Sequence, residues 1–236
     1  MSQTFALEWD KTGEHWFSTG VDRGVVYPWD KTNSQYGAGE AWNGLTSVDE
    51  SPEGGEASPY YANNRKYLNL MSTEEFAGSI GAYTYPDAFA TCIGEVNQSG
   101  LILTGQPHKP FCFTYRELKG NDTDGIEAGY ILHLVYNALA TPPSRSHATT
   151  NESAEPEEMS WDFTTTAEEV DGAKPTAHFK IDSTTLTTEG QAALASLEQI
   201  LYGTPADATA TPPTAAVAPA FPTIAQLLTL FPASSQ

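Results

Sequence analysis

The stretch that decides the fold runs from Ala41 to Cys92 and reads AWNGLTSVDESPEGGEASPYYANNRKYLNLMSTEEFAGSIGAYTYPDAFATC. Two of its segments, residues 41–51 and 66–71, have the alternating apolar pattern of strands. Between them, Pro52–Asn64 is acidic and rich in Gly and Pro, which predicts a loop. A further strand is predicted at Glu75–Tyr85, which is rich in aromatic and small residues and stops at a proline. The stretch therefore predicts a sheet with a projecting loop, and a loop of about 15 residues within a compact domain is commonly functional.

On the predicted strands the apolar residues recur at every second position, as they do when one face of a sheet is buried. We therefore expect four of them to support the sheet: Leu68, Leu70, Phe76 and Ile80. Alternation alone does not fix the face of every other side chain, because a slip of one residue in register inverts them all.

The composition indicates a folded protein that avoids nucleic acid and membranes. Its 236 residues are enough for one domain with a sizeable core, with or without tails. The 11 Lys and Arg residues against 30 Asp and Glu residues give a formal net charge of −19, which repels phosphate groups and anionic lipid surfaces. We expect no membrane span and no secretory signal, because no apolar run is long enough. Two widely spaced cysteines, Cys92 and Cys112, fit a reducing cytosol.

Downstream of the quoted stretch the sequence predicts mostly strands. Phe111–Lys119 and Ala128–Leu139 are separated by a segment in which Asp124-Gly125 predicts a hairpin turn. Because Ala128–Leu139 is apolar on both faces, it predicts a central buried strand. Alternation predicts two more strands at Met159–Thr165 and Lys174–Ser183.

One long helix is marked near the end of the chain. Thr188 and Gln191 form a predicted capping box, apolar residues follow at helical spacing, and Gly203 followed by a proline marks the end. Shorter helical segments are predicted at Asp87–Gly94 and, beyond a linker rich in Ala, Thr and Pro, at Phe221–Phe231. We expect the last segment to dock on its own domain or on a neighbouring subunit.

The predicted organisation has three parts. Residues 1–38 are an extended N-terminal arm, residues 39–203 are a β domain, and residues 204–236 are a low-complexity linker with a docking segment. The many aromatic residues of the arm either cover the core of their own domain or dock on another surface.

The sequence carries no motif of catalysis or cofactor binding. It lacks a phosphate loop, a dinucleotide-binding glycine fingerprint, HExxH, paired CxxC and GxSxG. Counting acids does not exclude a paired-carboxylate glycosidase, but most of the acids fall in predicted loops. We therefore expect no enzyme activity, no catalytic residue and no cofactor.

Histidines also give no sign of a metal site in the sequence. They are scattered along the chain: His15, His108, His133, His147 and His178. None has an acid or a cysteine at the sequence spacing typical of metal ligands. His133 falls inside the most apolar predicted strand and is interpreted as a buried histidine whose hydrogen bonds are satisfied.

The acidic residues are interpreted as solvated. One cluster leads into the predicted loop: Asp49, Glu50, Glu53 and Glu56. Carboxylates can ligate a hard cation, but the spacing here is irregular. Asp122–Gly125 resembles the start of a calcium loop, yet Glu127 is too close to supply the terminal ligand that such a loop requires. No metal ligand is therefore expected among them.

The ordered series of segments resembles the major tail proteins of long-tailed, non-contractile bacteriophages. The resemblance begins in the quoted stretch and continues through PFCFTYR (110–116), GYILHLVYNALATPPSRSHAT (129–149), MSWDFTTT (159–166) and KPTAHFKIDS (174–183). It closes with ALASLEQILYGT (193–204) and an apolar C-terminal piece. The Ala/Thr/Pro-rich stretch 204–219 looks longer than is usual in that family.

The resemblance implies a tail tube protein, mainly β, with a β-sandwich or partly open barrel, one flanking helix and extended N- and C-terminal arms. Members form hexameric rings that stack into a hollow tube. The implied partners are further copies of the chain, a tape measure protein, and tail terminator and distal tail proteins. Phage DNA passes through without specific binding, and no membrane is involved. The implied location is the virion, after assembly in the host cytoplasm.

The resemblance also implies which residues contact an adjacent ring. In related tubes the loop between the first two sheet strands has this role, and the terminal arms, here Met1–Val26 and Pro219–Phe231, add contacts. The corresponding loop residues here are Asp49, Glu50, Ser51, Glu53, Glu56, Tyr60, Tyr61, Arg65 and Lys66.

Two alternatives stay open. A related phage structural protein, such as a tube-end or capsid decoration protein, predicts closed rings that never elongate. A soluble β-sandwich module that binds sugars or calcium, suggested by Asp122–Gly125 and the aromatic residues, predicts a stable monomer with metal-dependent melting. The charge of −19 favours the tube, because an anionic bore lets DNA slide without sticking.

Overall fold

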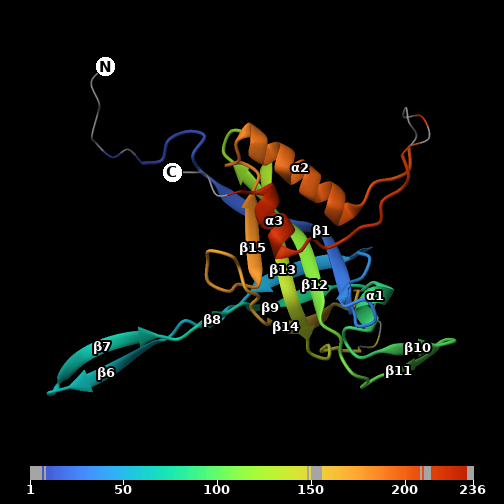
Figure 1. Ribbon diagram of the computed structural model, residues 1–236, viewed down its shortest axis with the longest axis horizontal. Coiled ribbons are helices and arrows are strands. Elements are labelled where there is room, and N and C mark those ends of the chain that lie inside the picture. The colour runs from blue at the N-terminus through green and yellow to red at the C-terminus, as the bar shows by residue number, and fades with distance from the viewer. Residues whose placement is uncertain are drawn as a thin grey trace.

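The computed structural model of the chain describes residues 7, 9–147, 149, 156–207, 209 and 214–232. The chain is mainly β, with a large antiparallel sheet, one long helix and open sheet edges, which confirms the predicted fold class (Figure 1). The nine-stranded main sheet comprises β1 (Phe17–Asp30), β2 (Gln35–Tyr36), β3 (Glu40–Ala41), β4 (Leu45–Glu50), β9 (Ala77–Ala82), β12 (Phe111–Asn121), β13 (Gly125–Ala140), β14 (Met159–Thr165) and β15 (His178–Asp182). The other elements are β5 (Glu53–Gly54), β6 (Ala57–Ala62), β7 (Arg65–Met71), β8 (Glu74–Glu75), β10 (Val96–Gln98), β11 (Leu101–Leu103), α1 (Asp87–Ala90), α2 (Thr188–Tyr202) and α3 (Ile224–Leu230).

Strand β13 organises the sheet because it is long enough to pair with three neighbours. Its 16 residues pair with β12 along one edge, and with β15 and then β14 along the other. The strand order β2-β1-β12-β13-β14-β9-β4 therefore has β15 as a branch at β13, and β3 adds beside β1. Strand β4, at one end, also contacts β1 without forming a ladder with it in the described residues. The sheet thus curls into a partly open barrel.

An irregularity in β13 changes which side chains face the barrel interior. Asn137 has a φ of 48°, and the register with β12 shifts beside it. Simple alternation predicts that Ala138 shares the face of Leu134, but Ala138 packs with Val135 in the barrel interior. A bulge at this position explains the exchange, since one extra residue moves every later side chain to the opposite face.

Apolar side chains form two cores, one on each face of the β12–β13 pair. The barrel interior holds an aromatic cluster in which the Trp42 ring contacts those of Phe113 and Trp161. The other face packs against α2 and α3, which lie across β12 and β13 in Figure 1. Alternate residues of β12 pack into the two cores, with Phe113 inside the barrel and Cys112 beneath the helices.

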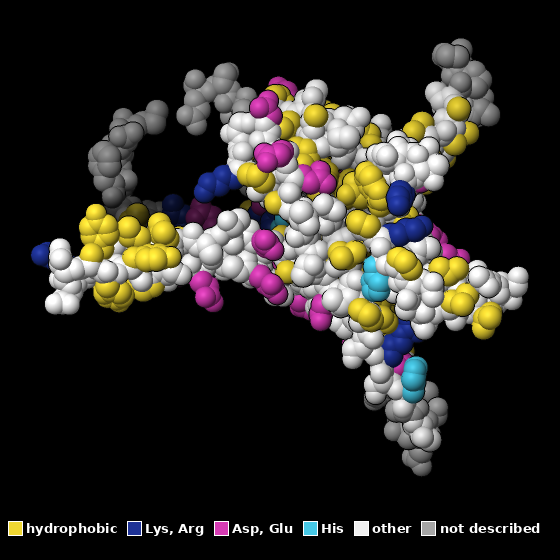
Figure 2. All heavy atoms as spheres, turned by 60° about the horizontal axis from the view of Figure 1, so that its bottom comes forward, with side chains coloured by type: hydrophobic (Ala, Val, Ile, Leu, Met, Phe, Trp, Pro, Cys, Tyr) yellow, Lys and Arg dark blue, Asp and Glu magenta, His cyan; other side chains and the backbone are white. Residues whose placement is uncertain are grey.

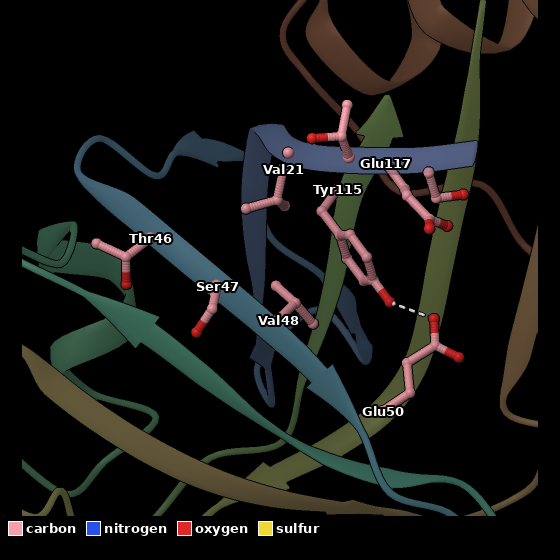
Figure 3. A pocket seen from close by; sticks show the side chains of 10 residues that line it. Val21, Thr46, Ser47, Val48, Glu50, Tyr115 and Glu117 are labelled. Atoms are coloured by element: carbon pink, nitrogen blue, oxygen red, sulfur yellow. Dashed lines mark hydrogen bonds between the residues drawn. The ribbon is translucent and has the colours of Figure 1, made fainter. Parts of the chain in front are cut away.

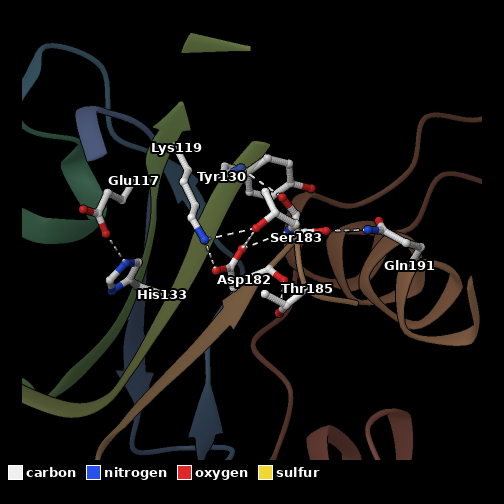
Figure 4. A network of polar contacts seen from close by, with 9 residues as sticks. Glu117, Lys119, Tyr130, His133, Asp182, Ser183, Thr185 and Gln191 are labelled. Carbon is white, nitrogen blue, oxygen red and sulfur yellow. Dashed lines mark hydrogen bonds and ion pairs between the residues drawn. The ribbon is translucent and has the colours of Figure 1, made fainter. Parts of the chain in front are cut away.

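The N-cap of α2 lies one residue before the predicted one. The Thr187 hydroxyl accepts the backbone N–H of Gly190, so Thr187 is the cap. The predicted capping box of Thr188 and Gln191 is wrong, because the Gln191 amide donates to the Ser183 carbonyl and ties the helix to the end of β15 (Figure 4). Because Thr187 and Thr188 are adjacent, the sequence alone is compatible with either residue as the N-cap.

The C-terminal segment docks on its own domain, one of the two outcomes that the sequence predicts. Ile224 and Leu227 of α3 are buried in the core that α2 covers. Thr223 and Gln226 form a capping box that fixes the start of α3. Neither α3 nor any other helix of the described residues is long and apolar enough to cross a membrane.

The linker before α3 doubles back on itself in its described part. Thr204 pairs with Val217, and Asp207 pairs with Thr214. The linker is therefore a narrow bridged loop at these positions, where the sequence predicts an extended or disordered chain. Residues 208 and 210–213 lie outside the described residues.

Part of the expected N-terminal arm belongs to the main sheet. Phe17–Asp30 forms β1, which pairs with β12 over most of its length. Alternation does not reveal this strand because its register shifts near Gly20 and again near Arg23, both of which have a positive φ. The division into three parts otherwise stays a prediction.

The turn predicted at Asp122–Gly125 joins β12 to β13, as expected. The Asp122 carboxylate accepts the backbone N–H of Gly13 at 2.9 Å, so the N-terminal arm is tied to this turn. Residues 1–6 and 8 of the arm lie outside the described residues.

The predicted loop Pro52–Asn64 is mostly β structure, so that prediction is wrong. Its strands β5 and β6 pair with β8 and β7 to make a narrow ribbon that extends from the main sheet (Figure 1). The expectation that Leu68 and Leu70 support the sheet is also wrong, because they lie in this ribbon and are 38% and 55% exposed. Ile80 is fully buried and Phe76 packs against the same core, as predicted. Ribbon and core strands share the same period of two, so alternation does not separate them.

Candidate functional site

Strands β6 and β7 form a hairpin that stands away from the rest of the subunit (Figure 1). At its tip Asn63 and Asn64 have φ values of 50° and 59°, the left-handed conformation that asparagine tolerates and that a tight two-residue turn requires. Every residue of both strands is exposed. The hairpin therefore has no packed face within this subunit.

The hairpin exposes many large apolar side chains. Those that are more than a third exposed are Tyr60, Tyr61, Tyr67, Leu68, Leu70 and Met71. Figure 2 shows apolar side chains gathered over the projecting β6–β7 hairpin. A two-stranded hairpin by itself is marginally stable in water, and an exposed apolar patch marks an interaction site. The hairpin is thus the strongest candidate for a contact between this subunit and another molecule.

A short acidic stem, the β5–β8 pairing, joins the hairpin to the main sheet. Glu53 lies directly opposite Glu75 in this pairing, and like charges at opposed positions repel. Gly54 has a φ of 82°, and a Cβ there would lie 2.2 Å from the Thr73 carbonyl oxygen. The stem therefore requires a glycine and carries a charge pair that a cationic neighbour would relieve.

The nine residues predicted to contact an adjacent ring follow the chain from the end of β4 to the hairpin tip. They are Asp49, Glu50, Ser51, Glu53, Glu56, Tyr60, Tyr61, Arg65 and Lys66. Glu50 differs from the rest, because its carboxylate turns toward the barrel and accepts from the Tyr115 hydroxyl at 3.0 Å and from the Lys180 ammonium at 2.7 Å. Contact of these residues with another ring stays a prediction.

Two histidines meet Glu50 at the base of the stem. His133 Nδ1 lies 3.2 Å from Glu50 Oε1 and 3.1 Å from His178 Nε2. On the other side of the ring, His133 Nε2 lies 3.3 Å from Glu117 Oε2 (Figure 4). Sequence spacing does not reveal this group, because its members come from β4, β12, β13 and β15, and only the curvature of the sheet brings them together.

Aromatic rings hold both histidines in place. Tyr115 stacks on His133 with the ring centroids 4.4 Å apart, and Phe76 stacks on His178 with the centroids 3.9 Å apart. His133 is fully buried and has polar partners at both nitrogens, as the sequence predicts. The two imidazole rings are therefore held between aromatic neighbours, and the His133 ring is shielded from water.

The surroundings set the charge of each member of the group. Burial lowers the pKa of His178 to about 3 and also holds the pKa of His133 below its ordinary value. Burial opposes ionisation of Glu50, but the hydrogen bonds from Lys180 and Tyr115 outweigh it, and the pKa of Glu50 lies below its usual range. Near pH 7 the group thus presents neutral imidazoles and a carboxylate.

A cleft opens beside this group, between β1 and β4. Its volume is about 440 Å³, and its lining includes Val21, Val48, Glu50, Tyr115 and Glu117 (Figure 3). The cleft lies where the two ends of the curled sheet approach without pairing. It leaves the side chains of Glu50 and Glu117 30% and 33% exposed, so water reaches both carboxylates.

A second, smaller hairpin, β10–β11, projects from the opposite end of the long axis (Figure 1). Val96, Leu101 and Ile102 on it are 41%, 65% and 54% exposed. Two projecting apolar hairpins at opposite ends give the subunit two candidate contact surfaces.

The main sheet also leaves strand edges free within the subunit. Among the described residues, β4 pairs only with β9 and β15 pairs only with β13. A free edge exposes backbone donors and acceptors that a strand of another molecule can complete.

No protein-family model and no curated protein matches the chain. Solved structures with some likeness include the sheath/tube terminator of an extracellular contractile injection system (PVC) in the extended state, with a TM-score of 0.33 and 11% identity over 68% of this chain and 96% of that chain. The tube-terminating cap of the anti-feeding prophage has a TM-score of 0.36 and 9% identity over 77% of this chain and 97% of that chain. The baseplate of the same prophage has a chain with a TM-score of 0.35 and 11% identity over 78% of this chain and 100% of that chain. Likeness of this extent does not define the function of the chain.

Proposed function

We propose that the chain is a structural subunit of a phage tail tube and that its β6–β7 hairpin docks on a neighbouring subunit. The observation that carries the proposal is the hairpin, an intrinsically marginal element whose large apolar side chains are all exposed in the single subunit. A neighbouring copy would supply the packing that the hairpin lacks.

In its finer form, the proposal follows the resemblance of the sequence to major tail proteins: six copies form a ring, and rings stack into a tube. Hairpins at opposite ends suit an open, repeating stack, because each subunit then offers contacts on two sides. The free edges of β4 and β15 suit a ring in which neighbours extend one another's sheets. A net charge of −19 suits a bore through which DNA slides.

The proposed role is structural rather than catalytic. Its proposed partners are copies of the same chain, a tape measure protein, and terminator and distal tail proteins, with DNA in transit. The proposed location is the virion. A tube-end or decoration protein of similar fold would differ in one respect, because its rings would not elongate.

Replacing the hairpin, Ala57–Met71, by a short Gly/Ser turn tests the proposal. The full chain is expected to form stacked rings or tubes in negative-stain micrographs. The shortened chain is expected to stay folded, because every deleted residue is exposed, but to lose stacking. Circular dichroism and melting curves provide the folding control.

Three outcomes would contradict the proposal or part of it. Normal tubes from the shortened chain would overturn the role of the hairpin. Single closed rings of the full chain that never elongate would identify a tube-end protein. A monomer at every salt and crowding condition tested would overturn the structural role altogether.

A further inference from the structure

Three potential metal ligands converge at the base of the acidic stem. A carboxylate oxygen of Glu50, a ring nitrogen of His133 and a ring nitrogen of His178 all lie within 4.8 Å of one another. His133 Nδ1 lies 3.2 Å from Glu50 Oε1 and 3.1 Å from His178 Nε2. A tetrahedral zinc site with bonds of about 2.0–2.1 Å places its ligand atoms roughly 3.4 Å apart. The Glu50–His133 and His133–His178 separations are therefore close to the spacing of such a site, and the third, between Glu50 and His178, is within 4.8 Å.

The hydrogen bonds of His133 leave a lone pair at the centre of the group. A neutral His133 carries one N–H, which Nε2 donates to Glu117 when the proton is on that nitrogen. The Nδ1 lone pair then points toward His178 Nε2 at 3.1 Å and Glu50 Oε1 at 3.2 Å. It can accept an N–H from His178, or both imidazoles can present lone pairs to a metal ion that Glu50 Oε1 also reaches.

We propose that Glu50, His133 and His178 bind a divalent transition-metal ion, with Zn²⁺ as the best fit, and that Glu117 orients His133. Imidazole and carboxylate are ligands that Zn²⁺ accepts. A carboxylate on the second nitrogen of a ligand histidine is a common feature of metal sites, where it fixes the tautomer and the ring. The cleft lined by Glu50 and Glu117 lets water reach the carboxylate side of the proposed site.

The charges around the site favour a dication. Glu50 and Glu117 bring two negative charges, and Lys180 brings one positive charge through its 2.7 Å contact with Glu50. The Tyr115 hydroxyl also donates to Glu50, so the proposed ligand carboxylate is held in place before a metal arrives.

A bound ion would add a link between β4 and the β13–β15 pair, beside the contact that Lys180 already makes with Glu50. Glu50 is the last residue of β4, His133 lies in β13, and His178 begins β15. Because the stem follows Glu50 directly, the ion would anchor the base of the hairpin to the body of the subunit. The proposal concerns the single subunit and does not depend on tube assembly.

Calorimetric titration of the purified full chain, stripped with a chelator, with Zn²⁺ tests the proposal. We expect one equivalent to bind and to raise Tm by about 5–10 °C at a free Zn²⁺ concentration near 100 times Kd. Co²⁺ bound at the same site should give the visible absorption bands of a four-coordinate ion. The hairpin-deleted chain should bind equally well, which separates this test from that of the assembly.

Single substitutions test whether the ion binds at the proposed residues. His178→Ala is expected to weaken Zn²⁺ binding by at least about 100-fold, and Glu117→Gln by about 10- to 100-fold. His147→Ala is the matched control, because His147 also lies beside an acid, Glu157, but is 79% exposed. Its affinity should equal that of the unaltered chain.

Two results would overturn the proposal: no saturable Zn²⁺ binding by the full chain, or binding that His178→Ala leaves intact. If His178→Ala fails to fold in the chelator, Glu50→Gln decides, because it keeps the shape of the ligand side chain and removes its charge. Unchanged affinity in that variant would equally overturn the site.

Discussion

Glu53 lies directly opposite Glu75 in the stem that joins the projecting hairpin to the main sheet. The two exposed carboxylates repel each other across a ladder only two residues long on each strand. The ladder therefore fixes the direction of the hairpin weakly in a single subunit. A neighbouring molecule that packs on the hairpin would supply the remaining constraint.

Reversing one of these charges should stiffen the stem. In Glu75→Lys the opposed pair becomes attractive, and we expect hydrogen exchange of the backbone amides in residues 57–71 to slow by a factor of about 1.5 to 5. Exchange measured by mass spectrometry on the dilute subunit checks this. Glu127→Lys makes the same charge change at an exposed site elsewhere, and it should leave hairpin exchange unaltered. Equal slowing in both variants would point to net charge instead of the stem.

Aromatic residues of the hairpin should matter for assembly and not for folding. Tyr61 and Tyr67 are 71% and 74% exposed, so replacing both by Ser should leave Tm within about 2 °C of the unaltered chain. If they anchor a subunit contact, the protein concentration at which particles form should rise at least about tenfold. Light scattering across a dilution series measures that concentration.

The matched control for this pair is Tyr83→Ser, because Tyr83 is 46% exposed but lies outside the hairpin. Its assembly concentration should not change. A similar loss of assembly in Tyr83→Ser, or no loss in the double variant, would remove the hairpin from the proposed interface.

The sequence predicts those strands whose environment alternates strictly. Trp161 and Phe163 point inward from β14 as expected, because this strand is solvated on one face. Strand β1 is not predicted by alternation, because its two register shifts break the pattern. Leu68 and Leu70 alternate regularly but lie in a ribbon with no core beneath it, so alternation wrongly predicts that they are buried.

The two candidate sites also differ in how far the sequence predicts them. The acidic, Gly- and Pro-rich sequence predicts that a segment projects here, but it does not predict a hairpin, because Asn63-Asn64 is a weaker turn signal than Asn-Gly. Contact of this segment with another subunit stays a prediction. The group of Glu50, His133 and His178 could not be predicted by spacing. Its members meet only because β4 curls toward the β13–β15 pair, and that curvature depends on packing far from these residues.

Docking of α3 on its own domain predicts a large effect at Leu227. This side chain is 4% exposed in the core shared with α2, so Leu227→Ala should lower the free energy of unfolding by about 2–5 kcal/mol. Urea denaturation of the dilute subunit measures the change. Val217→Ala, at a side chain that is 59% exposed, should change it by less than about 0.5 kcal/mol. Stability unaffected by Leu227→Ala would mean that α3 packs on another copy in solution.

The contact between Asp182 and Lys119 should make stability depend on pH in a defined direction. Lys119 Nζ lies 2.5 Å from the Asp182 carboxylate, and the Thr184 hydroxyl and N–H also donate to it (Figure 4). Burial opposes ionisation of Asp182, but these donors outweigh it and hold its pKa below the usual range. A carboxyl whose pKa is lower in the folded state stabilises the fold above its unfolded pKa, about 3.9, and loses that effect as the pH falls through the folded value.

Asp182→Asn should therefore lower Tm by about 2–4 °C between pH 5 and 7, an effect limited by the partial exposure of the pair. The difference from the unaltered chain should shrink below about pH 4, because protonation then removes the charge from Asp182 as the substitution does. Asp162→Asn, at an exposed position of β14, serves as the control and should show no such dependence. A Tm difference for Asp182→Asn that stays constant down to about pH 3 would mean that Asp182 stabilises β15 through its hydrogen bonds alone and that its charge contributes nothing.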